Sequence, residues 1–201
     1  LCQINFKTNF MKNLLITLLF TLIGITTYAQ DSIRIDENGG FSQVITTKIT
    51  AKKEYTYARS YFIGKINNYQ SAVQIEDVEN GKIVLKANKD FQTISDKLMG
   101  KPINYDGIEK FNITIDCKDN RFRIKVDAVR FTYDGFISMV SNGGNLKQRA
   151  KIFSHENEDY RLFIPQINNP EAFNKKRKEF FCRLVADLKG YMEQQANEDN
   201  F

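Results

Sequence analysis

The chain has 201 residues, with 29 lysines and arginines against 24 aspartates and glutamates, and a formal net charge of +5. It contains no tryptophan and a single histidine, His155. So small a positive excess argues against a nucleic-acid-binding protein, and we expect no nucleic-acid partner. The length suits one domain with a sizeable hydrophobic core.

The N-terminal segment has the pattern of a secretory signal peptide. Lys12 precedes an apolar run over residues 14–25, which is too short for a comfortable membrane span, and a small-residue site ends at Ala29. We therefore predict a signal peptide over residues 11–29. A buried N-terminal strand or helix is the alternative, but the apolar pattern does not continue beyond Ala29.

This assignment divides the rest of the N-terminus and bears on the cysteines. Residues 1–10 become an upstream extension outside the fold, and the polar residues 30–40 become a flexible leader. Since no cysteine stands at the cleavage site, we expect a periplasmic or secreted protein without a lipid anchor, whose mature form does not span the membrane. Export would permit a disulfide between Cys117 and Cys182, although two buried thiols are the commoner arrangement.

The clearest strand signal is a hairpin over residues 110–133. In its first arm the apolar residues alternate with polar ones, at Phe111, Ile113, Ile115 and Cys117. Asp119-Asn120 suits a tight turn, because both residues tolerate positive φ. In the second arm the apolar positions change parity beyond Asp127-Ala128, which predicts a β-bulge or sharp bend there.

The remaining elements follow from local patterns. In chain order they are a strand over 41–49, a helix over 51–67 with Thr50 as N-cap, strands over 72–78 and 82–88 joined by a turn at Asn80-Gly81, and a helix from Pro170 to about Gln195 capped by Asn169. Two segments, 90–107 and 134–168, are predicted to be irregular, the second with a short helix over 146–153.

The C-terminal helix has an apolar stripe and a basic cluster. The stripe comprises Phe173, Phe180, Phe181, Leu184, Leu188 and Met192. Residues 175–178 are all basic, and we interpret them as a solvated helix face.

The element order β-α-β-β-β-β-α predicts an α+β fold, in which a curved antiparallel sheet carries its helices on one face. We expect residues 41–196 to form a single domain with irregular insertions at 90–107 and 134–168.

Several motifs resemble one family. They are the opening FSQVI at residues 41–45, the helix over 55–66, ENGKI at 79–83, FNITI at 111–115 and DNRFR at 119–123. Over about half of the chain this pattern resembles the domain-of-unknown-function 4468 family of exported bacterial proteins. The resemblance implies a TBP-like fold, with no established activity and no catalytic residues to transfer. A DNA-binding role by analogy is not expected, because the outward positions of the predicted sheet carry mixed charges.

Strand direction predicts where a binding site would lie. In a meander, the two irregular segments emerge at the same end of the sheet, and each carries a Tyr-Asp-Gly triplet. We expect Tyr105, Asp106, Tyr133 and Asp134 to lie near one another at that end. Together with Phe136 they are the candidate binding residues. The alternative is that both triplets are Asp-Gly turns with a packing tyrosine.

No catalytic, cofactor or metal site is predicted. Asp106 and Asp134 are the only pair that suggests a hydrolase, while Cys182 and His155 lack partners at a catalytic or metal-binding spacing. The function that the sequence favours is an exported, non-enzymatic domain that binds a protein or a cell-envelope component. A small-ligand or glycan-binding module using residues 90–107 and 134–168 is the first alternative, and a hydrolase is the second. The sequence leaves the partner and the oligomeric state open.

Overall fold

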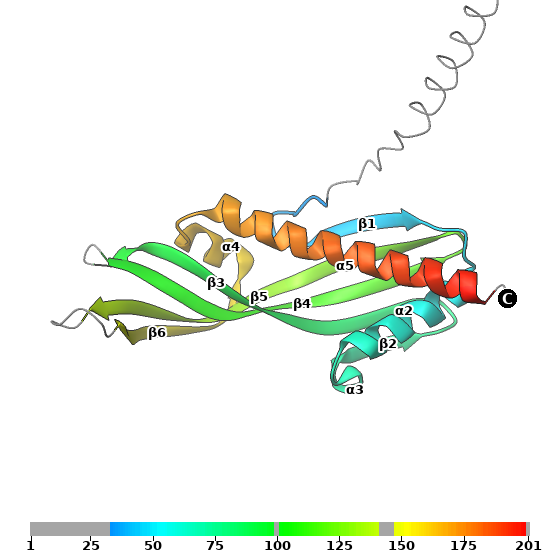
Figure 1. Ribbon diagram of the computed structural model, residues 1–201, viewed down its shortest axis with the longest axis horizontal. Coiled ribbons are helices and arrows are strands. Elements are labelled where there is room, and N and C mark those ends of the chain that lie inside the picture. Colours follow the sequence, from blue (N-terminus) through cyan, green and yellow to red (C-terminus); the bar gives the residue numbers. More distant parts are fainter. Residues whose placement is uncertain (1–32, 99–100, 141–146, 200–201) are drawn as a thin grey trace, which may run out of the picture. The chain divides into compact units, whose positions relative to one another are not determined.

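The computed structural model describes residues 33–98, 101–140 and 147–199 (Figure 1). The signal peptide predicted over 11–29 and the extension over 1–10 lie outside the described residues. Within the described residues, no helix is long and apolar enough to cross a membrane.

The described chain folds around a six-stranded, open antiparallel sheet. Its strands are β1 (Phe41–Thr46), β2 (Val73–Asp77), β3 (Lys82–Leu98), β4 (Lys101–Lys118), β5 (Arg121–Val140) and β6 (Lys147–Asp159). The order is β1-β5-β4-β3-β2, and β6 also pairs with β5. Since β1 pairs with residues 121–126 of β5 and β6 with residues 130–140, the two strands share one edge end to end.

The helices are α2 (Ala51–Lys65), α3 (Tyr69–Ala72), α4 (Tyr160–Phe163) and α5 (Pro170–Glu198), with a 3-10 turn, η1 (Ile164–Gln166). In Figure 1, α5 (orange to red) runs along the sheet. The ring of Phe111 on β4 lies 5.5 Å from that of Phe181 on α5, and Tyr61 of α2 lies 5.6 Å from Tyr191 of α5. The predicted α+β class, with helices on one face of a curved antiparallel sheet, is therefore confirmed.

The predicted parity change in β5 is confirmed. Ile124 and Val126 are buried before it, and Val129 and Phe131 are buried after it. Ala128 between them adopts φ 52°, and the pairing of β4 with β5 shifts register opposite this point. The bulge keeps the apolar side chains of both halves of β5 on the helix-covered face. Asn120 takes φ 63° in the hairpin turn, as predicted.

The two segments predicted to be irregular are mostly strands. Residues 90–98 extend β3 and residues 101–107 begin β4, while residues 134–140 extend β5. Residues 147–159 form β6 in place of the short helix predicted over 146–153. Glycines suggested turns here, but Gly107 and Gly135 lie inside strands.

Gly107 and Gly135 are explained by the close approach of neighbouring side chains and not by a turn. A Cβ on Gly107 would come within 2.6 Å of the Cβ of Tyr133, and one on Gly135 within 2.4 Å of the Phe153 ring. Glycine in a strand marks such a close approach.

Three smaller predictions also need correction. The alternating pattern of the strand over 72–78 predicts Ile75 on the apolar face of the sheet. Ile75 is instead 46% exposed, because the pairing of β2 with β3 shifts register between Val73 and Ile75. Residues 33–40, predicted to be flexible, are held: Ile33 is buried, and the Asp36 carboxylate accepts hydrogen bonds from the backbone of Asn38 and Gly40.

The N-cap of α2 differs from the expected one. Thr50 occupies the N-cap position, but its side chain makes no capping hydrogen bond. Instead, the backbone N–H of Ala51 donates to Oδ1 of Asp119 at 2.8 Å, so the hairpin turn caps the helix. At the start of α5 the prediction is confirmed, since the Asn169 side chain accepts from the backbone N–H of Ala172 at 2.9 Å.

Candidate functional site

The structure brings the two Tyr-Asp-Gly triplets together. β4 and β5 pair so that Asp106 lies opposite Asp134 and Tyr105 lies opposite Gly135. The rings of Tyr105 and Tyr133 are 5.0 Å apart. The predicted proximity is therefore confirmed, although the two segments meet as paired strands and not as loops.

The two tyrosines face the core. Tyr105 is 4% exposed and Tyr133 is 2% exposed, and both rings pack against Phe163. The Tyr133 hydroxyl donates to the carboxylate of Glu158 or to the side-chain carbonyl of Gln166, 2.9 Å away. Burial raises the pKa of Tyr133, so the hydroxyl remains a donor. Neither tyrosine offers a ring face to a ligand in this arrangement.

The two carboxylates lie on the opposite face of the sheet, where β6 supplies a cation to each. Arg149 Nη2 lies 2.6 Å from Oδ2 of Asp106, and Lys151 Nζ lies 2.8 Å from Oδ1 of Asp134. The hydrogen bonds from Lys151 and from Ser154 hold the pKa of Asp134 below its usual range. Opposing like charges on paired strands are destabilising, and these two cations offset that repulsion.

Phe136, the fifth predicted residue, takes part in the same cluster. The Arg149 guanidinium lies 4.4 Å from the centre of the Phe136 ring, within the range of a cation–π interaction. Arg149 therefore contacts Asp106 and Phe136 together, and we call these three residues the Asp106–Arg149 cluster. Arg149 had no signal in the sequence analysis, because residue 149 fell in a segment predicted to be a short helix.

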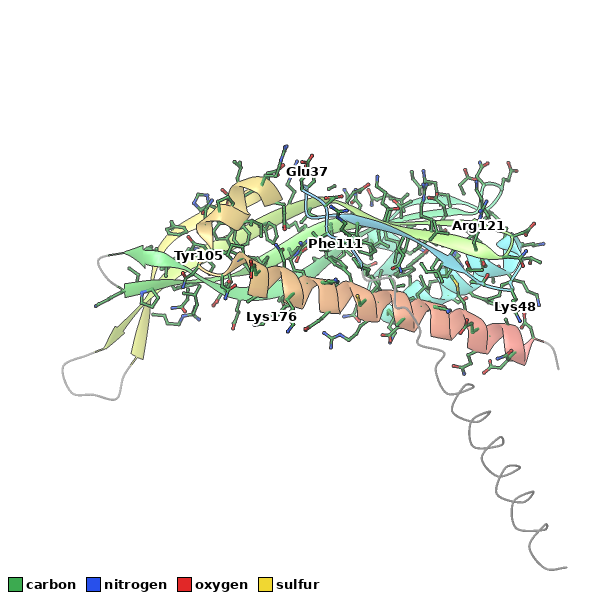
Figure 2. All side chains as sticks on the ribbon, turned by 90° about the horizontal axis from the view of Figure 1, so that it is seen from above. Glu37, Lys48, Tyr105, Phe111, Arg121 and Lys176 are labelled. Carbon is green, nitrogen blue, oxygen red and sulfur yellow. The ribbon has the colours of Figure 1, made fainter. Side chains whose placement is uncertain are left out.

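A cavity of about 540 Å³ opens beside this cluster, at the edge of β3 and the beginning of α5. Its polar and apolar lining includes Gln92, Ile94, Asn104, Asp106, Arg149 and Lys176. Figure 2 shows Lys176 on α5 in the same half of the described sheet as Tyr105. Of the five predicted residues, only Asp106 lines this cavity.

A second cavity, of about 470 Å³, continues along the same strand edge. It shares Gln92, Phe173 and Lys176 with the first cavity. Its further lining is more basic and includes Lys89, Arg177 and Arg183. Together the two cavities form a groove between the edge of β3 and the first half of α5, which we call the β3–α5 groove.

Residues 41–132 match a family described as "Domain of unknown function (DUF4468) with TBP-like fold". This confirms the resemblance found in the sequence motifs. The matched residues include β1 to β4 and most of β5, whereas Asp134, Phe136, Arg149 and all of α5 lie beyond them.

Two solved structures are similar to this chain. A DUF4468 family protein from Bacteroides ovatus ATCC 8483 has 12% sequence identity and a TM-score of 0.48, over 80% of this chain and 90% of that one. A TBP-like protein from Parabacteroides distasonis ATCC 8503 has 16% identity and a TM-score of 0.44, over 81% and 97%. No curated protein matches this chain.

A buried ion pair joins residues 41–132, the segment that matches the family, to α5. Glu109 is 0% exposed, and its Oε1 accepts from Nε and Nη2 of Arg177, at 2.8 and 2.6 Å. Arg177 was predicted to lie on a solvated helix face, which is wrong, since it is 1% exposed. The missed signal is spacing: Arg177 lies four residues after Phe173 and four before Phe181, within the apolar stripe.

The two cysteines and the histidine of the described residues lie on three different elements, β4, α5 and β6. Cys117 and Cys182 are both free, and burial raises the pKa of the Cys117 thiol to about 12. His155 lies in β6 with its ring 5.2 Å from that of Tyr133. Within the described residues, no group of three histidine, cysteine or acidic side chains could hold a metal ion.

Proposed function

We propose that this protein is an exported, non-enzymatic domain that binds another protein or a cell-envelope component. The observation that supports the proposal is the β3–α5 groove beside the Asp106–Arg149 cluster, where charged side chains of three elements converge at one end of a rigid sheet. Export is supported by the signal-peptide pattern over residues 11–29. An N-terminus that begins at Gln30 in the protein recovered outside the cytoplasm would test it.

The shape and lining of the groove favour a protein partner over a small ligand. Small-molecule sites enclose their ligand and are mostly apolar, with aromatic walls. Here Tyr105 and Tyr133 are packed into the core, and the Arg149 guanidinium lies over Phe136. A glycan or small-ligand site that uses these rings is therefore the less favoured alternative.

The two carboxylates also weigh against a hydrolase. Acid–base hydrolysis needs one carboxyl group that keeps its proton near neutral pH. Asp106 and Asp134 each lie beside a β6 cation, and the pKa of Asp134 is lowered. Such carboxylates are suited to charge recognition more than to proton donation.

Crosslinking and affinity capture of the full chain, expressed in a cell that exports it, test the proposal. The informative variant is the charge exchange Asp106→Arg with Arg149→Glu, which retains an ion pair and reverses the charge pattern beside the groove. Asp116→Arg with Arg123→Glu is the matched control, because Arg123 Nη2 and Asp116 Oδ2 form a 2.6 Å ion pair at the other end of the same face.

We expect one reproducible partner in the envelope or the medium, lost in the first variant and retained in the control. Loss in both variants, or in neither, would contradict a site at the Asp106–Arg149 cluster. Absence of any partner from both fractions would contradict the protein-binding role, and a glycan panel would then test the alternative. Alanine variants of Tyr105 and Tyr133 are unsuitable, because truncating buried rings tests folding.

A further inference from the structure

One stretch of β3 has an open edge. β4 pairs with β3 along one side from Lys82 to Leu98, but on the other side β2 pairs with residues 82–85 alone. The next backbone hydrogen bond on that side is at Ile94, whose carbonyl accepts from the backbone N–H of Asn168 at 2.8 Å. Within the described residues, no strand pairs with the outer edge of residues 86–93.

The backbone of this edge is oriented to pair. In an antiparallel strand, the N–H and C=O of one residue point to the same side, and successive residues alternate. The Ile94 carbonyl points outward, and the pairing of β3 with β4 has no register shift between Lys82 and Ile94. The backbone groups of Asn88, Asp90 and Gln92 therefore also point away from β4, as a row of donors and acceptors that an added strand can use.

The β3–α5 groove gives this edge a side wall. Residues 89–94 of β3 line the two cavities that form this groove, and Phe173 and Lys176 of α5 line both of them. A segment laid along the edge would thus contact the backbone of β3 on one side and side chains of α5 on the other. This combination supplies both the affinity and the specificity of strand addition.

The charge of the groove indicates the chemistry of the segment. Lys89, Lys176 and Arg183 line the second cavity, and none of them has an ion-pair partner among the described residues. Burial lowers the pKa of Lys89, the Glu109 charge raises it, and the neighbouring cations Arg177, Arg183 and Lys176 lower it. Arg177 also lines this cavity, and its Nη1 atom is buried without a hydrogen-bond partner in the described part of the chain. Asp90 and Glu179 offset this positive charge only in part.

We propose that residues 86–93 of β3 accept an extended, acidic segment of a partner protein as an additional strand, with its carboxylates facing Lys89, Lys176 and Arg183. This rests on the proposed binding function and names the chemistry of the partner. A second copy of the chain does not fit the edge, because pairing two identical basic edges would bring like charges together.

The probe is a fluorescein-labelled peptide of about ten residues with alternating threonine and glutamate, compared with its threonine–lysine counterpart. Fluorescence anisotropy with the full chain at about 0.15 M salt measures both affinities. The acidic peptide should bind at least about tenfold more tightly than the basic one. Equal affinities would overturn the proposal.

Two variants separate strand addition from attraction by charge alone. Asn88→Pro removes one outward N–H, and proline is tolerated on an edge strand. Lys176→Glu with Arg183→Glu reverses the charge of the groove, and Lys175→Glu with Lys178→Glu is the matched control, since neither residue lines a groove cavity. Each test variant should weaken acidic-peptide binding at least about tenfold, and the control less than about twofold.

Binding that survives Asn88→Pro, in a variant whose circular dichroism and melting temperature match the parent, would overturn strand addition. Equal loss in the charge variant and its control would overturn the assignment of the cations. Affinity capture with Asn88→Pro then distinguishes this inference from the proposed function. A partner that is still captured, and is still lost with the Asp106–Arg149 exchange, would leave the function standing and reject the edge as its site.

Discussion

Glu54 and Glu109 are both fully buried in the helix-covered side of the sheet, yet the fold accommodates them differently. The Glu109 carboxylate receives two hydrogen bonds from the Arg177 guanidinium. Glu54, in α2, accepts from the Thr47 hydroxyl and from the backbone of Lys118, and it has no ion-pair partner among the described residues. Burial raises the pKa of Glu54 to about 7.

A buried carboxylate needs an opposite charge or a proton, and the two sites represent these two solutions. The Arg177 solution also connects distant parts of the chain. Its Nη2 donates to the carbonyl of Gly39 at 2.7 Å, and its guanidinium lies 4.9 Å from the Tyr160 ring. One side chain of α5 thus joins β4, the segment before β1 and α4.

The largest expected effect comes from breaking the ion pair on one side. Arg177→Met leaves the Glu109 carboxylate buried and uncompensated, which should lower the free energy of unfolding by about 3–5 kcal/mol. Combining it with Glu109→Leu removes the stranded charge, and most of the loss should be recovered. Urea denaturation followed by circular dichroism measures both values.

Lys176→Met is the control for that pair, because it makes the same substitution at the next residue of α5, where the side chain is exposed. It should change the unfolding free energy by less than about 0.5 kcal/mol. A double variant no more stable than Arg177→Met alone would contradict the explanation that the uncompensated Glu109 carboxylate destabilises the single variant.

The second prediction concerns Glu54 and pH. Its carboxyl group titrates near 4.5 in the unfolded chain and near 7 in the folded one, so the folded chain holds this proton more tightly. The stabilisation from protonated Glu54 is therefore complete below about pH 4.5, falls as the pH rises toward 7, and stays lost above it. The total loss is on the order of 3 kcal/mol.

Glu54→Gln should abolish this part of the pH dependence, because the amide does not titrate. Urea denaturation at a series of pH values between about 4 and 8 measures the slope. Asp119→Asn refines the test: the Asp119 charge raises the pKa of Glu54, so removing it should move the titration slightly to lower pH. A slope that survives in Glu54→Gln would show that another group carries it.

The difference between the Glu54 and Glu109 sites could be predicted in part from the sequence. Glu109 stands two residues before Phe111 in β4, in the register whose side chains face the core, and Arg177 stands in phase with Phe173 and Phe181. The four consecutive basic residues of α5 were interpreted together as a solvated face because of their charge, and the helical position of each residue was not considered separately. The helical period alone would have predicted a buried Arg177, because the angular position of a residue around the helix axis decides which face it lies on, whatever its side chain.

The strands were predictable where the pattern was local. The parity change at Ala128 predicted a bulge, because one inserted residue moves every later side chain of an alternating strand to the other face of the sheet. By contrast, Tyr105-Asp106-Gly107 suggested a turn, because the reason for Gly107 lies on the neighbouring strand, where Tyr133 occupies the space of a side chain. Arg149 was not predicted as a site residue for the same reason, because its partners Asp106 and Phe136 lie on two other strands.

The smallest effect is expected at the Asp106–Arg149 pair, and it sharpens the contrast with Glu109–Arg177. Both are Arg–carboxylate pairs with a shortest N–O distance of 2.6 Å, but the Arg149 side chain is 45% exposed and that of Arg177 is 1% exposed. A double-mutant cycle with Asp106→Asn and Arg149→Gln should give a coupling below about 1 kcal/mol in the unfolding free energy, which decreases with added salt.

This weak coupling is what the proposed function requires. An ion pair that contributes little to folding can exchange its partners for those of a bound protein at little cost, whereas Arg177 cannot leave Glu109 without stranding a charge in the core. A coupling of more than about 2 kcal/mol, insensitive to salt, would make Arg149 a structural residue like Arg177. The Asp106–Arg149 cluster would then support the end of the sheet, and the site of recognition would have to be sought in the rest of the β3–α5 groove.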